Sequence, residues 1–213
     1  MRFIRKIRYN QDIDLIKHPG HVFWYGLLLL CVVGAPFFLD NYLLGELAQV
    51  FIYAIAGAGL MLLVGYTGLV SLGHGAFLAL GAYLHGYLFN AGLPLPVSLA
   101  LASTITALIG GIISIPALRM TGIYLAVATL AFAVIIEQVL VHWEGVTGGL
   151  RGMPIPPAEI FGVALNTPQA FYFLCLFLLL CSLWLVLNVL RSPSGRAMLA
   201  IRDSETSAES MGI

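Results

Sequence analysis

The sequence predicts an all-α protein, a polytopic transmembrane helical bundle with about six spans in this chain. Hydrophobic residues make up 60% of the 213 residues, and charged residues make up only 9%. A soluble domain is usually about one quarter charged, so this chain cannot cover a globule with polar surface. The apolar residues are also grouped into runs of the length that crosses a hydrocarbon core of about 30 Å.

The chain divides into three regions along its length. Residues 1–21 form a polar arm that holds five basic residues, Arg2, Arg5, Lys6, Arg8 and Lys17. Residues 22–190 form a transmembrane region, and residues 191–213 form a polar tail with helical signals. The basic stretch before the first apolar run is long for a cleaved signal peptide, and no convincing small-residue cleavage site follows it.

Six apolar runs follow one another in the transmembrane region, and each is bounded by polar residues, glycine or proline. The first ends at Asp40, and the fourth ends at Arg119. Pro94 and Pro96 predict a turn between the third and fourth runs, because proline does not continue a helix. A loop rich in glycine and proline, at residues 144–169, precedes the last run. The predicted spans are residues 22–39, 47–64, 76–89, 98–118, 123–142 and 170–190.

The distribution of basic residues predicts a cytoplasmic amino terminus. With the amino terminus inside, the arm and the inner segments hold nine of the ten Lys and Arg residues, and only Arg151 lies outside. This asymmetry follows the positive-inside rule, and it places residues 144–169 in an outer loop. Trp24 and Tyr25 then lie at the inner interface, and Tyr42, Trp143 and Tyr172 lie at the outer one, as an aromatic belt would.

The stretch GYTGLVSLGHG, residues 65–75, predicts a broken or re-entrant segment between the second and third spans. It has four glycines, three hydroxyl side chains, one histidine and no formal charge. Such a composition suits irregular backbone that is shielded by protein or lines a wet cavity, and broken helices often mark substrate paths in transporters. A tight turn at the membrane surface is the equally weighted alternative. No Cβ is expected to fit at Gly73 or Gly75, which flank His74.

Few side chains in the spans suggest chemistry. Glu137 is the one acidic residue well inside a span and is therefore a candidate for the translocation path, although it could also reach the interface or pair with a neighbouring helix. His74 and His85 lack a partner motif, and the three cysteines lie inside apolar runs as small buried side chains, so no metal or cofactor is expected. There is no pairing of acid, base or nucleophile that predicts an enzyme, and no basic patch that predicts nucleic-acid binding.

The tail predicts two short helices. Ser192 and Pro193 are a favourable N-cap and first helical residue, and Thr206 with Glu209 forms a possible capping box. Gly212 is a favourable residue just past a helix end. The small residues Gly195, Ala200 and Ala208 would let a soluble partner come close, whereas the alternative is an amphipathic connector lying on the lipid.

Three stretches together resemble the bacterial branched-chain amino-acid ABC transporter permeases. They are GYTGLVSLGHGAFLALGAY, then GIYLAVATLAFA with VTGGLRGMPIP, and SPSGRAMLAIRDSETSAESMGI. Their order and the TGG loop are similar to the M-type rather than the H-type permease. The resemblance implies an importer in the bacterial inner membrane, in which a periplasmic solute-binding protein delivers substrate, an H-type permease completes the path, and two ATP-binding cassette subunits drive it. Family members continue through further spans, so this chain is expected to be a fragment.

The resemblance also implies three sets of functional residues. ATPase coupling would fall on Gly195, Arg196, Ala200, Ile201, Glu205, Ala208, Glu209 and Gly212. The translocation path would fall on Gly65, Gly68, Ser71, Gly73, His74 and Gly75. The outer-loop motif would be Thr147, Gly148 and Gly149, although Leu150 and Arg151 stand where the family commonly has polar or acidic residues. Alternatives are a permease for urea, short amides or another small polar solute, and a passive channel.

Overall fold

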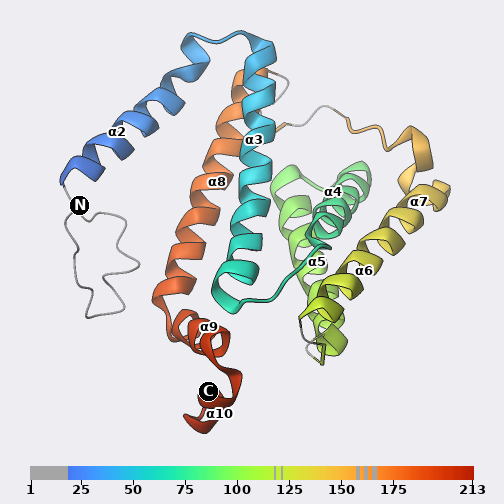
Figure 1. The fold of residues 1–213 in the computed structure, drawn as a ribbon. Coiled ribbons are helices and arrows are strands. Elements are labelled where there is room, and N and C mark those ends of the chain that lie inside the picture. The colour runs from blue at the N-terminus through green and yellow to red at the C-terminus, as the bar shows by residue number, and fades with distance from the viewer. Residues whose placement is uncertain (1–18, 118, 121, 157–158, 161–162, 165–166) are drawn as a thin grey trace. The chain divides into compact units, whose positions relative to one another are not determined.

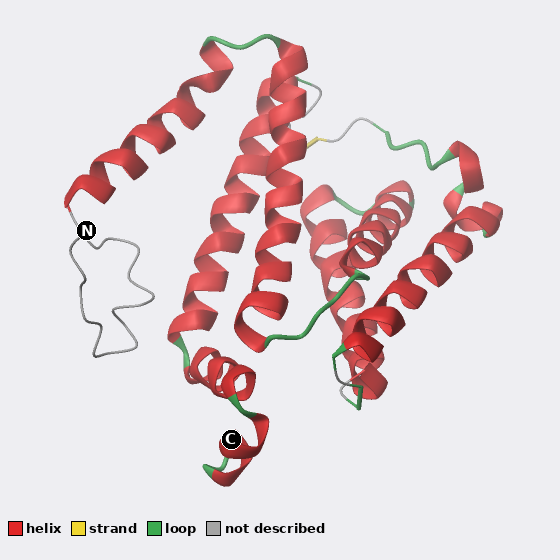
Figure 2. Cartoon of the chain, viewed as in Figure 1, coloured by secondary structure: helices red, strands yellow, loops and turns green. Residues whose placement is uncertain are grey.

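A computed structural model describes residues 19–213 of this chain, with the exception of 118, 121, 157–158, 161–162 and 165–166. Helices dominate the described residues, so the prediction of an all-α polytopic protein is confirmed (Figure 2). Most of the basic arm lies outside the described residues. The chain forms two compact units, one made of Met1–Ala58 and Phe171–Ile213 and the other of Gly59–Ala170.

The first unit is built around two long helices that run side by side, α3 (Asn41–Leu60) and α8 (Pro168–Arg191) (Figure 1). Its core is apolar and consists of Leu44, Ala48 and Phe51 from α3 and Tyr172, Cys175 and Leu176 from α8. Helix α2 (Pro19–Gly34) precedes them and ends in the short 3-10 helix η1 (Ala35–Phe37). Cys175 is buried as expected, whereas Cys31 on α2 is exposed, so the expectation of burial is wrong there.

Tyr172 is a core residue of the first unit. Its side chain is fully buried, and its ring lies 5.1 Å from that of Phe51. Its hydroxyl donates a 2.7 Å hydrogen bond to the carbonyl oxygen of Val32 in α2. In a continuous helix this carbonyl would accept from residue 36, but Pro36 has no N–H to donate. The tyrosine thus supplies a donor that the proline lacks, and its place at the outer interface stays a prediction.

The second unit packs α4 (His74–Asn90) against both α5 (Leu95–Ala117) and α6 (Ile123–His142). Small residues permit the close approach of α4 and α5, since a Cβ at Gly110 would lie 3.3 Å from the ring of Phe77. The same Phe77 ring also lies 5.2 Å from the ring of Phe132 in α6. Such close packing of small and aromatic residues replaces the hydrophobic effect as the source of helix association in lipid.

Pro96 lies inside the first turn of α5, which begins at Leu95. The prediction that both prolines belong to the turn is wrong for Pro96, because a missing N–H costs nothing among the first helical residues. The turn itself is made by Gly92, which has a positive φ of 92°, and by Pro94.

The loop at residues 144–169, for which an outer location is predicted, is more structured than the sequence suggests. It contains the single turn α7 (Glu144–Thr147) and the 3-10 helix η3 (Gly149–Arg151). Two short strands, β1 (Glu159–Ile160) and β2 (Val163–Ala164), then pair antiparallel.

The tail forms α9 (Pro193–Asp203) and α10 (Glu205–Ser210), which pack on each other, and the predicted pair of short helices is confirmed. Ser192 precedes Pro193 at the N-cap position of α9, but its hydroxyl donates to Val189 instead of capping the helix. The cap of α10 is Ser204, whose hydroxyl accepts from the N–H of Ser207, so the predicted capping box at Thr206 is wrong.

Gly212 lies just past the end of α10, as predicted. Its φ is +81°, and the N–H groups of Gly212 and Ile213 donate to the carbonyls of Glu209 and Ala208. This is the paired hydrogen-bond pattern that glycine permits just past a helix end.

Among the residues that the structure describes, five helical stretches are long and apolar enough to cross a membrane, and they account for five of the six predicted spans. They are Gly20–Phe37, Asn41–Tyr66, Leu95–Ala117, Ile123–His142 and Pro168–Arg191. The remaining predicted span coincides with α4, which has 17 residues and follows the irregular segment.

Candidate functional site

The predicted broken segment is present between α3 and α4, which confirms this part of the predicted fold. The helix widens into a π-helical stretch, η2 (Met61–Tyr66), and regular helix resumes only at His74. In the gap, the hydroxyl of Thr67 and the N–H of Leu69 both donate to the carbonyl of Leu63. Gly68 has a φ of +73°, a conformation that glycine adopts without steric cost. The residues from Thr67 to Gly73 are called the break below.

The break is held against α6 by one hydrogen bond. The N–H of Leu72 donates to the hydroxyl oxygen of Thr129 at 3.0 Å. Thr129 lies six residues after the start of α6, which is about 9 Å along the helix axis. Helix α6 is long and apolar enough to span a membrane. The break contacts α6 about two turns from its start, and the N–H of Leu72 is paired there by a protein group, as irregular backbone in lipid requires.

The two glycines beside His74 differ in the space around them. A Cβ built at Gly73 would lie 2.3 Å from the carbonyl oxygen of Thr129, whereas nothing lies within 4 Å of one built at Gly75. Gly73 is also buried, and Gly75 is exposed. The expectation that no Cβ fits is therefore right for Gly73 and wrong for Gly75, which lies in the first turn of α4 and faces open space.

The other path candidates of this stretch lie around the break. Gly65 is in the π-helical turn and Gly68 in the break, and both are exposed. Ser71 and His74 are partly buried. The imidazole of His74 packs over Gly59, where a Cβ would lie 3.3 Å from its Nε2 atom. This contact joins the helix before the break to the helix after it.

His85 lies near the other end of α4, where its Nδ1 atom is 3.0 Å from the hydroxyl of buried Ser98. That hydroxyl has one proton, which it donates to the carbonyl of Leu95, so His85 must donate its Nδ1 proton to it. His85 is thus a packing residue that joins α4 to α5. No three His, Cys, Asp or Glu side chains within the described part of the chain gather as metal ligands would.

Glu137 is not brought to the break. It lies eight residues beyond Thr129 on α6, about 12 Å farther along the axis, and its side chain is exposed on the surface of this chain. A carboxylate so placed faces lipid, water or another chain, and its role in the path stays a prediction.

Thr147 caps the carboxyl-terminal end of α6. Thr147 is 3% exposed, and its hydroxyl lies within hydrogen-bond distance of the carbonyls of Leu140 and Trp143, at 2.6 and 2.9 Å. The same oxygen accepts the N–H of Gly149 at 3.1 Å. The last carbonyls of a helix lack partners within it, so Thr147 supplies what α6 itself cannot.

The two glycines that follow Thr147 are required by their geometry. Both have positive φ angles, +75° at Gly148 and +58° at Gly149. A Cβ at Gly148 would lie 2.3 Å from the carbonyl oxygen of Gly152, and one at Gly149 would lie 2.9 Å from the Glu144 side chain. The Thr-Gly-Gly motif therefore shapes the loop, and any further role in transport stays a prediction.

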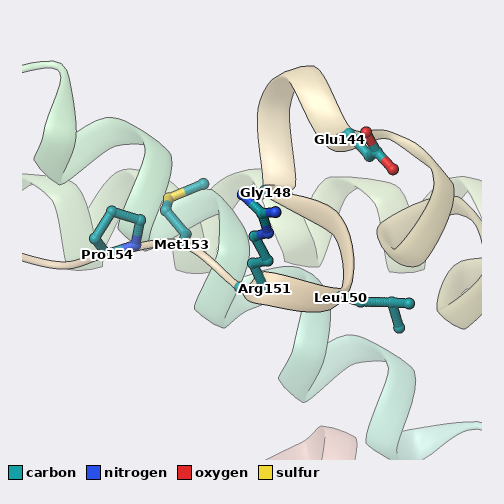
Figure 3. Close-up of a pocket in the computed structure, with 7 residues that line it drawn as sticks. Glu144, Gly148, Leu150, Arg151, Met153 and Pro154 are labelled. Carbon is teal, nitrogen blue, oxygen red and sulfur yellow. The ribbon is translucent and has the colours of Figure 1, made fainter.

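The loop leaves an open cavity of about 870 Å³ (Figure 3). Its lining combines a carboxylate, a guanidinium and apolar groups: Glu144, Gly148, Leu150, Arg151, Gly152, Met153 and Pro154. In Figure 3, Arg151 points toward Gly148, and Leu150 points in a different direction from Arg151. The loop is fastened to the end of α4, because the side-chain amide of Asn90 donates to the carbonyl of Pro154 and Met153 packs on Gly86.

The predicted coupling residues of the tail separate into two groups. Gly195 and Ala208 are buried within the first unit, so they do not offer a surface to a partner, contrary to the expectation from their size. Ala208 is 3% exposed in the helix that packs on α9, and Gly195 lies against the last turn of α8. Ala200 is partly buried. The exposed members are Arg196, Ile201, Glu205, Glu209 and Gly212.

Sequence reasoning missed two residues that organise these sites. Thr129 has a detectable signal, since it is the one serine or threonine among the apolar residues of α6. Asn90 has none, because its amide contacts a loop carbonyl 64 residues away in the sequence.

Comparison with known proteins agrees with this architecture. Residues 42–213 match the family model described as the branched-chain amino acid transport system, permease component. Two high-affinity branched-chain amino acid transport system permease proteins named LivM, from Salmonella typhimurium strain LT2 and Escherichia coli strain K12, are 32% and 31% identical to this chain over 211 residues. The alignments cover 87% of this chain and 50% of each relative, so the chain spans about half the length of these relatives. No solved structure matches it. The chain is a multi-pass membrane protein and belongs to the family of branched-chain amino acid transport permease components.

Proposed function

We propose that this chain is part of the membrane-spanning permease subunit of an ABC importer for branched-chain amino acids. The observation that carries the proposal is the tail, in which a span is followed directly by two short helices with exposed Arg196, Ile201 and Glu209. A short surface helix of this kind suits docking into a groove of a soluble partner. A passive channel has no need of such a docking element.

The partners follow from the same proposal. An H-type permease would complete the translocation path, a periplasmic solute-binding protein would deliver the solute, and two ATP-binding cassette subunits would hydrolyse ATP. Both relatives are named as branched-chain amino acid permeases, which supports this solute class. The chain itself performs no covalent chemistry in this scheme, because solute movement follows from changes in helix tilt.

Within the permease, we place the solute path beside the break. A π-helical turn and the six residues from Gly68 to Gly73, which are not in a regular helix, leave backbone groups that are not used by an α-helical ladder. Such groups, in a protein-lined cavity, are suited to polar parts of a solute. Gly65, Gly68 and Ser71 are the candidates with some exposure, whereas Gly73 is buried against the backbone of Thr129 in α6.

Transport by the full-length protein tests the function. The permease should be reconstituted in lipid vesicles with its H-type, ATPase and solute-binding partners, and radiolabelled leucine uptake should be measured. We expect saturable uptake that requires ATP and the binding protein and is inhibited by excess isoleucine or valine. Inhibition by urea or acetamide instead would favour the alternative solutes, and ATP-independent equilibration would indicate a channel.

The amino terminus is proposed to be cytoplasmic, because nine of the ten basic residues then lie inside. In a background without the three native cysteines, an impermeant thiol reagent applied from outside should label Leu150→Cys. Leu150 is 90% exposed at the tip of the outer loop. The reagent should not label Ser194→Cys on the tail, and labelling of Ser194→Cys would reverse the topology.

A further inference from the structure

We infer that Thr129 is the positioning residue of the break: its hydroxyl anchors the irregular backbone to α6, and this anchor keeps the proposed solute path in shape. The break is the one stretch between α3 and α4 where several consecutive N–H groups lack the helical ladder. An N–H left unpaired at membrane depth would cost several kcal/mol. Leu72 finds its acceptor on another helix, 57 residues along the chain.

The hydrogen-bond chemistry assigns a direction to this contact. A threonine hydroxyl has one proton and two acceptor lone pairs. The proton of Thr129 goes to the carbonyl of Ala126 at 2.9 Å, one turn earlier in α6. The oxygen is then left to accept the N–H of Leu72 at 3.0 Å. The result is a chain from the Leu72 N–H through the Thr129 hydroxyl to the Ala126 carbonyl, in which each hydrogen bond strengthens the next.

The backbone comes close enough for this contact only because Gly73 follows Leu72. A Cβ at Gly73 would lie 2.3 Å from the carbonyl oxygen and 3.3 Å from the Cβ of Thr129. Thus the glycine removes the obstacle and the threonine supplies the acceptor, at the same point of α6. Valine at position 129 would keep the shape of the side chain and lose the acceptor, whereas serine would keep the acceptor.

Hydrogen exchange tests the anchor directly, without any assumption about transport. The full-length protein in lipid nanodiscs should be compared as wild type, Thr129→Val, Thr129→Ser and Thr104→Val. Thr104 is the matched control, since it is an exposed α5 threonine whose hydroxyl donates to its own helix at Ala100. Peptides covering residues 67–73 should exchange about 3 to 10 times faster in Thr129→Val, the range expected for one lost hydrogen bond. They should be unchanged in Thr129→Ser and Thr104→Val.

Transport by the same variants tests the positioning role, and this arm alone rests on the proposed function. Leucine uptake should fall several-fold in Thr129→Val and be retained in Thr129→Ser. Unchanged exchange in Thr129→Val would overturn the anchor, and faster exchange with full uptake would overturn its role in the path. If the wild type takes up no branched-chain amino acid, the proposed function fails while the exchange experiment still decides the anchor. Thr129→Ala, which also lacks the hydroxyl, takes the place of Thr129→Val if that variant does not accumulate in the membrane.

Discussion

Replacing Gly73 by alanine should destabilise the protein by at least about 2 kcal/mol and abolish most leucine uptake by the reconstituted transporter. The added Cβ would lie 2.3 Å from a backbone carbonyl oxygen of α6, a distance at which backbone must move. Overpacking of a close contact typically costs about 1–3 kcal/mol, and here no flexible side-chain end can yield. The shift would also draw Leu72 away from Thr129. Thermal unfolding in detergent and uptake in vesicles measure the two effects.

Gly75→Ala is the matched control, because it adds the same methyl group two residues later. Nothing lies within 4 Å of a Cβ at this position, and it is in the first turn of α4. Alanine stabilises a helix relative to glycine by up to about 1 kcal/mol, so the melting temperature should stay the same or rise. Equal losses of stability in the two variants would mean that the contact of Gly73 with α6 is not the cause.

Replacing Gly195 by alanine should separate the tail from the ATPase while leaving the spans in the membrane. A Cβ at Gly195 would lie 2.4 Å from the carbonyl oxygen of Leu190 and 2.7 Å from its Cα atom. The corner between α8 and α9 must therefore open, and α10 would move with α9 because the two pack together. The exposed side chains of Arg196 and Ile201 would then point in a different direction relative to α8. We expect co-purification of the ATPase with the full-length permease to fall at least about tenfold, a loss of about 1.4 kcal/mol or more.

Gly26→Ala on α2 is the control of the same chemical type. It is an exposed helical glycine of the first unit with nothing within 4 Å of an added Cβ. Gly26→Ala should retain the ATPase at the wild-type level. Both variants should accumulate in the membrane in wild-type amounts. Full retention of the ATPase by Gly195→Ala would show that the direction of the tail does not matter for docking, and the reading of the tail as a connector on the lipid would take its place.

Much of the fold is encoded locally and could be predicted. The fifth span begins and ends as predicted, at Ile123 and His142, because Gly122 and Trp143 bound a predominantly apolar run. The broken segment is also local, since four closely spaced glycines destabilise helix wherever they occur. Helix ends were less predictable. Ser204 and Thr206 are both reasonable caps, and only the backbone at Ser204, with a φ of −166°, decides between them.

What could not be predicted depends on contacts between distant residues. The sequence around Ala208 shows a small residue on a short helix, and only the packing of α10 on α9 reveals that it is covered. Gly73 and Gly75 look alike in sequence, and the carbonyl of Thr129 alone distinguishes them. The same limit applies to Tyr172, whose hydrogen bond to the carbonyl of Val32 joins residues 140 positions apart in the sequence.

The bond between Tyr172 and Val32 has a consequence for biogenesis. Chains are made from the amino terminus, so α2 is synthesised 140 residues before its partner in α8. During that interval the Tyr172 hydroxyl is not yet present to bind the Val32 carbonyl, and Pro36 has no N–H to donate to it. Helix α2 therefore reaches its final hydrogen bonding only after α8 has been made. Ribosome-bound chains that end before residue 172 should hold α2 loosely, and synthesis of α8 should fix it.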